Sequence, residues 1–205
     1  MARIQKAWAL VLAAALVLAL AGCGAQPKAE DTVRQFCDAM KTLDLETMQS
    51  SVSSRGEDQT DLEELLTGED SEEYAFLLDY VKELAGQIDY EITAASQDGD
   101  KGTVTVHFKH IDASDVVKRA FQDYLMKGIG MAFSGAGEEE MAQLLKDCFA
   151  EAIRTTKTGE AEATIEFKCT KKDGKWLIDE VPDELASVIM GNMDKALEGL
   201  SENFS

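Results

Sequence analysis

The sequence predicts an α+β domain with four antiparallel strands and helices that cover one face of the sheet. Three observations indicate this class. Apolar residues recur with a helical period over most of the chain. The period changes to two on both sides of an Asp-Gly pair, at 98–99 and again at 173–174, which is typical of β-hairpins. A helical stretch lies between these hairpins, and segregated hairpins and helices are typical of an α+β fold.

The composition indicates one globular domain. The chain has 205 residues, of which 45% are hydrophobic and 29% are charged, and this excludes global disorder. It carries 39 acidic against 20 basic residues, a formal net charge of −19. This charge excludes a nucleic-acid partner and direct electrostatic adhesion to anionic lipids. Any membrane attachment must therefore be covalent or transmembrane.

The N-terminus has the layout of a secretory signal peptide. Met1–Lys6 is basic, Ala7–Ala21 is an unbroken apolar run, and small residues then precede Cys23. The run Leu20-Ala21-Gly22-Cys23 resembles the lipobox of bacterial lipoproteins, which implies a diacylglycerol on the Cys23 thiol and a membrane anchor. A plain cleaved signal with a chance cysteine is the alternative. The expected organisation is a signal peptide at 1–22, a lipidated tether at 23–29 and a single domain at 30–205.

Four helices are expected before the first strand. The first begins at Glu30, the second follows Asp44 as N-cap, and capping boxes at 60–63 and 70–73 open two more. The last of these ends at Gly86. The apolar residues expected to face inward are Val33, Phe36, Cys37, Met40, Leu45, Met48, Val52, Tyr74, Leu77, Leu78, Val81 and Leu84.

The alternating segments predict the four strands. Their expected inward residues are Ile88, Tyr90, Ile92 and Ala94, then Val104, Val106 and Phe108, then Ala161, Ala163, Ile165, Phe167 and Cys169, and finally Trp176 and Ile178.

The remaining helical segments form a pair between the hairpins and one helix after them. The pair is split at 134–137, and the last helix is expected to run without a break from Pro182. The expected inward residues are Val116, Val117, Ala120, Tyr124 and Leu125, then Met141, Leu144, Leu145, Cys148 and Ala152, and then Leu185, Val188, Ile189, Met193, Ala196 and Leu197.

Five segments carry a resemblance to a set of proteins. They are Asp31–Phe36, Gly102–Val106, Ala132–Gly135, Glu138–Met141 and Asp173–Asp179. Together with the element order, they resemble uncharacterised lipoproteins of Gram-positive bacteria with a nuclear-transport-factor-two-like or cystatin-like domain of unknown function. The resemblance implies a curved antiparallel sheet that wraps a helix into a cone with a pocket.

Four residues are candidates for lining such a pocket: Tyr90, His110, Tyr124 and Trp176. His110 continues the inward series of its strand, whereas His107 points to the opposite face and toward solvent. Core packing explains Tyr90, Tyr124 and Trp176 equally well, and a hydrogen-bonded structural histidine is the favoured alternative for His110. No catalytic residue, metal site or cofactor is assigned, and weak cation binding by the acidic run 57–73 is the remaining metal alternative.

Three further cysteines, Cys37, Cys148 and Cys169, occupy apolar positions and are expected to be buried thiols. A Cys148–Cys169 disulfide is the alternative, because an exported domain is exposed to oxidants.

The expected function is a non-catalytic module that binds an unknown small ligand or an envelope protein. One alternative is an acid–base enzyme that uses His110 or Asp179 beside a tyrosine. Another is a structural or assembly lipoprotein of the cell envelope. An exposed apolar patch on the 183–197 helix would favour a protein partner.

Overall fold

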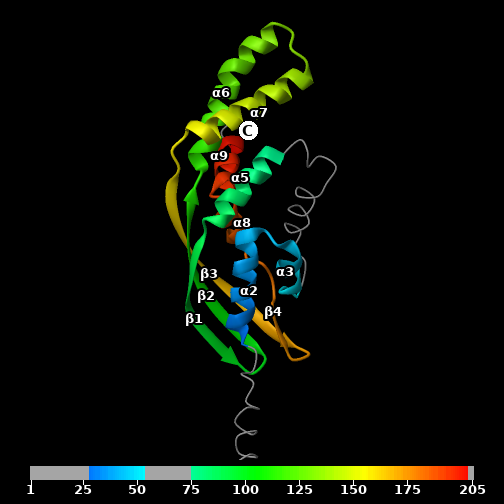
Figure 1. The fold of residues 1–205 in the computed structure, drawn as a ribbon, viewed down its shortest axis with the longest axis vertical. Helices are drawn as coiled ribbons and strands as arrows, with labels where there is room; N and C mark the ends of the chain where they lie inside the picture. The colour runs from blue at the N-terminus through cyan, green and yellow to red at the C-terminus, as the bar shows by residue number, and fades with distance from the viewer. Residues whose placement is uncertain (1–27, 54–74, 203–205) are drawn as a thin grey trace, which may run out of the picture.

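A computed structural model describes residues 28–53 and 75–202 and shows an α+β fold (Figure 1). One open sheet has the strand order β1-β2-β3-β4, and every pairing is antiparallel. The predicted fold class, with its two hairpins and helices on the sheet, is therefore confirmed. The strands are β1 Asp89–Asp98, β2 Lys101–Asp112, β3 Gly159–Lys172 and β4 Lys175–Ile178.

The helices described in this part of the chain precede, separate and follow the two hairpins. They are α2 Ala29–Thr42, α3 Leu45–Ser50, α5 Ala75–Gly86, α6 Ser114–Phe133, α7 Glu138–Thr155, α8 Glu184–Ile189 and α9 Met193–Glu202.

Both Asp-Gly turns lie where the sequence predicts them. Gly99 and Gly174 have positive φ angles of 59° and 80°, which glycine adopts without steric cost. The inward alternation of β1 ends early, because the register shifts between Ile92 and Ala94. This β-bulge leaves Ala94 exposed, so its predicted inward position is wrong.

Helix α2 fills the inner face of the sheet. The ring of Phe36 meets that of Phe167 edge-on, with 5.9 Å between centroids, and Phe108 meets Phe167 at 6.4 Å. A Cβ atom on Gly102 would lie 2.9 Å from the Cβ atom of Ala29, so glycine lets the start of α2 approach β2 closely. The inner face is thus a packed core at this point.

Helices α6 and α7 form a hairpin, and the part from 121 to 148, here called the arm, projects beyond the end of the sheet (Figure 1). The predicted inward residues Val116, Val117 and Ala120 are buried at its base. Leu125 and Leu145 are 39% and 38% exposed, so their predicted inward positions are wrong. The arm lies past the end of the sheet, so these side chains are covered only in part.

The last segment is two helices, and the prediction of one unbroken helix is wrong. Gly191 and Asn192 both have φ angles of 59°, which ends α8 and turns the chain before α9. The carbonyl oxygen of Gly191 accepts a hydrogen bond of 2.8 Å from the backbone N–H of Ala113. Leu197, predicted to face inward, is 48% exposed because α9 starts in a new direction.

Several predictions lie outside the described residues. These are the signal peptide, Cys23, Tyr74, the capping boxes at 60–63 and 70–73, and the acidic run 57–73. None of the helices in the described part of the chain has the length and apolar character needed to cross a membrane.

Candidate functional site

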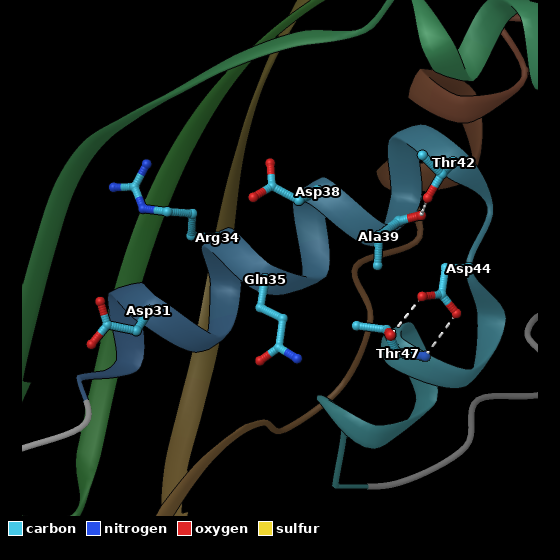
Figure 2. Close-up of a pocket in the computed structure, with 8 residues that line it drawn as sticks. All are labelled: Asp31, Arg34, Gln35, Asp38, Ala39, Thr42, Asp44 and Thr47. Atoms are coloured by element: carbon cyan, nitrogen blue, oxygen red, sulfur yellow. Dashed lines mark hydrogen bonds between the residues drawn. The ribbon is translucent and has the colours of Figure 1, made fainter.

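An open groove of about 450 Å³ lies between α2 and α3 (Figure 2). Most of its lining residues are polar, and they include three carboxylates and one guanidinium. The lining residues are Asp31, Arg34, Gln35, Asp38, Ala39, Thr42, Asp44 and Thr47.

Local capping builds the two walls of this groove. The Asp31 carboxylate accepts a hydrogen bond of 3.0 Å from the backbone N–H of Lys28 at the start of α2. Leu43, with a left-handed φ of 50°, then reverses the chain. Asp44 begins α3 by accepting bonds from the backbone N–H and the hydroxyl of Thr47, at 3.2 and 2.6 Å. These bonds lower the pKa of Asp44.

The other charged groups of the groove are also paired. Arg34 and Asp38 project from the same side of α2 (Figure 2). Arg34 donates a hydrogen bond of 2.8 Å to Glu30, which raises the pKa of the guanidinium. The Tyr90 hydroxyl donates bonds to the Asp38 carboxylate, at 2.6 Å, and to the backbone oxygen of Arg34, at 3.3 Å. Burial and the bonded Asp38 carboxylate raise the pKa of Tyr90. The hydrogen bonds of these charged groups therefore connect α2 and α3 internally and link α2 to β1.

Replacing Tyr90 by phenylalanine is expected to lower the free energy of unfolding by about 1 kcal/mol, because the bond to a charged carboxylate is lost. Urea unfolding at pH 7 measures this effect. Tyr124→Phe is the matched control, since no hydrogen bond of the Tyr124 hydroxyl occurs within the described residues. Equal stability of the two variants would contradict a structural role for the Tyr90–Asp38 bond.

The structure places the four candidate pocket residues on different elements. Trp176 of β4 is buried and would touch a Cβ atom on Gly102, near the start of β2. His110 is buried near the far end of β2, and Tyr90 packs its ring against Phe108 on the same face. Tyr124 lies on α6, in the arm. Of the four, Tyr90 contacts the groove, through its hydrogen bond to the lining residue Asp38.

The groups considered for acid–base chemistry have other neighbours. Nδ1 of His110 lies 3.0 Å from the carbonyl oxygen of Ile111. The Asp179 carboxylate lies 4.0 Å from Nζ of Lys101. His107 is on the opposite face, as predicted, but it is only partly exposed and contacts the Thr164 hydroxyl at 3.2 Å.

Cys37, Cys148 and Cys169 are buried free thiols, as expected from their apolar positions. Burial raises the pKa of all three, to about 12 for Cys37 and about 11 for Cys169. Such thiols are poor nucleophiles because the thiolate is the reactive form. Within the described residues, no cluster of three or more His, Cys, Asp or Glu side chains is arranged to hold a metal ion.

An exposed apolar surface lies on the arm. Met126, Ile129 and Phe133 of α6, here called the arm seam, are 70%, 60% and 90% exposed. Their spacing of three and four residues places them on one helix face. The inward series predicted for α6 does not include this face, although the same spacing is present in the sequence.

These features define an α+β domain with a projecting helical arm, and its sequence places it in a known family. Residues 77–191 match the family described as a domain of unknown function, DUF5105. The match covers more than half of the chain and runs from α5 to the turn after α8. The chain therefore belongs to the DUF5105 family.

One solved structure is similar to this chain. It is the crystal structure of YcdA from Bacillus subtilis subsp. subtilis str. 168, described as a candidate lipoprotein, with 20% sequence identity and a TM-score of 0.40. The alignment covers 78% of this chain and 57% of that chain, so the present chain spans little more than half of its length. No curated protein matches the sequence.

Proposed function

We propose that this protein is a lipid-anchored extracytoplasmic module that binds another protein through its arm. The observation that carries the binding function is the arm seam, whose three large apolar side chains are all more than half exposed. Contiguous exposed apolar residues of this kind mark interaction sites. A patch on the 183–197 helix would have favoured a protein partner, and the exposed apolar patch on α6 supports the same kind of partner.

The anchor is supported by the order of features at the N-terminus: basic start, apolar run, small pair and Cys23. A diacylglycerol on the Cys23 thiol would hold the chain on the outer face of the cell membrane, because each buried methylene contributes about 0.8 kcal/mol. The tether at 23–29 and the domain at 30–205 complete this organisation. Placement among Gram-positive lipoproteins with a nuclear-transport-factor-two-like or cystatin-like domain is part of the same proposal.

The mass of the mature N-terminus tests the anchor. In the native chain, the first residue is expected to be Cys23 carrying an acylated glyceryl group. Cys23→Ser is expected to abolish the lipid adduct and leave residues 1–22 attached, because the thiol that accepts the lipid is absent. Ala25→Ser, two residues downstream, is the control and should be processed normally. A native protein that retains Ala7–Ala21, or one that starts at another residue without lipid, would overturn the anchor.

The contacts of the titratable groups support binding over acid–base catalysis. The enzyme alternative requires His110 or Asp179 beside a tyrosine in a water-accessible cavity. His110 instead faces the Ile111 carbonyl oxygen, and Phe36, Phe108 and Phe167 pack together on the inner face of the sheet.

Photo-crosslinking in the native membrane tests the binding surface. A photoreactive phenylalanine analogue at position 129 of the full chain is expected to give protein adducts upon illumination. The same analogue at Leu197, which is 48% exposed on α9, is the matched control and should give none. Absence of adducts at position 129 would overturn binding through the arm seam and favour the structural alternative.

A further inference from the structure

The arm seam has the spacing of a coiled-coil interface. Met126, Ile129 and Phe133 fall at alternating intervals of three and four residues, which are the a and d positions of a heptad. A Cβ atom on Gly128 would lie 3.2 Å from the side chain of Met141, so this side of α6 packs on α7. The seam lies on the other side of α6, where no described element covers it.

Gly130 lies beside the seam, and no close contact in the described part of the chain requires glycine there. A Cβ atom at this position would meet no atom within 4 Å in the described structure. Glycine inside a helix costs roughly 0.5–1 kcal/mol relative to alanine. Its absence of a side chain would instead allow a second helix to approach the seam closely.

The charge around the seam also favours a second copy. The whole chain carries a net charge of −19, so most surfaces of two copies repel each other. Residues 124–137, however, contain one charged side chain, Lys127, and no acid. Two identical acidic chains can therefore pair through the seam without bringing carboxylates of the two copies close together.

The position of the arm relative to the N-terminus determines whether two anchored copies would pair in parallel or antiparallel. Helix α2 begins at the end of the molecule opposite the arm (Figure 1). If Cys23 carries the lipid, the six residues up to Ala29 span at most about 20 Å. This step rests on the proposed function. Two copies on one bilayer would then hold their arms in the same direction, away from the membrane.

We propose that the arm seam pairs in parallel with the arm seam of a second copy of this chain, around a two-fold axis along the arm. Such a contact is isologous, so each seam residue meets its own counterpart. The apolar part spans about two helical turns, and pairing therefore depends on the high effective concentration that a shared membrane provides.

Cysteine crosslinking in the full, membrane-bound chain tests this arrangement. Met126→Cys and Phe133→Cys are each expected to form a disulfide-linked dimer upon mild oxidation. Lys127→Cys is the matched control, because it lies next to Met126 in sequence but off the seam, and it should crosslink about tenfold less. All three sites are exposed, so the fold tolerates each change.

A second substitution tests whether the seam itself drives pairing. Adding Ile129→Asp to Phe133→Cys is expected to reduce the dimer about tenfold or more, because two carboxylates would face each other in place of two buried isoleucines. Circular dichroism checks that the variant is folded.

The remaining outcomes separate this inference from the proposed function. A crosslink that forms only when Met126→Cys and Phe133→Cys chains are mixed would show antiparallel pairing and overturn the parallel arrangement. Photo-adducts at position 129 that contain a different protein, without the dimer, would keep the binding function and overturn the second copy. No adduct and no dimer would overturn both.

Discussion

Replacing Gly191 by alanine is expected to lower the free energy of unfolding by roughly 2–4 kcal/mol. Two costs add at this position. The φ angle of 59° is unfavourable for a residue with a Cβ atom. That atom would also lie 2.8 Å from the carbonyl oxygen of Ile111 and 3.3 Å from the side chain of Leu84. Urea unfolding followed by circular dichroism measures the loss.

Gly199→Ala is the control for this prediction. Gly199 lies inside α9, and a Cβ atom there would meet no atom within 4 Å in the described structure. Alanine at this position should stabilise the domain by roughly 0.5–1 kcal/mol, because it removes the helix penalty of glycine. Similar stabilities of the two variants would show that Gly191 is not needed for the turn between α8 and α9.

The Cys37 thiol is expected to make the domain unstable in alkali. Burial raises its pKa from 9.0 to about 12 in the folded state. The unfolded chain therefore releases the thiol proton first, and stability present below pH 9 is lost as the pH rises toward 12. This group alone should remove roughly 2–3 kcal/mol between pH 9 and pH 11. Urea unfolding at the two pH values measures the change.

Two variants isolate this contribution. Cys37→Ala lacks the thiol, so its loss of stability between pH 9 and pH 11 should be smaller than that of the native chain by the same roughly 2–3 kcal/mol. Val33→Ala removes a neighbouring buried side chain of α2 and destabilises the domain at every pH, but it should keep the full alkaline loss. An identical pH dependence in Cys37→Ala and the native chain would refute the role of the buried thiol.

Much of the fold was predictable because local patterns and tertiary packing agree. The face of α2 that carries Val33, Phe36 and Cys37 is buried against the sheet. The two Asp-Gly pairs form the hairpin turns, since glycine adopts a positive φ without strain. Asp44 caps α3 through Thr47. In each case a few neighbouring residues suffice to specify the geometry.

The candidate site was predicted less well, because it depends on contacts between distant segments. The bond between Tyr90 and Asp38 joins residues 52 positions apart, and no periodicity reveals such a pair. The exposed arm seam was missed because a helical pattern shows which residues are apolar but not how far the helix extends past the core. Leu125 and Leu145 were predicted to face inward for this reason.

Local patterns along the chain were enough to predict the fold class, the hairpin turns and the burial of the three free thiols, because hydrophobic period and turn chemistry are local properties. The sequence also carries the expected lipid anchor at Cys23. The break at Gly191 depends on packing in the folded domain, where Ile111, Leu84 and Ala113 leave no room for a side chain. The exposure of the outer part of α6 also depends on the folded domain, because the end of the sheet determines how much of this helix is covered.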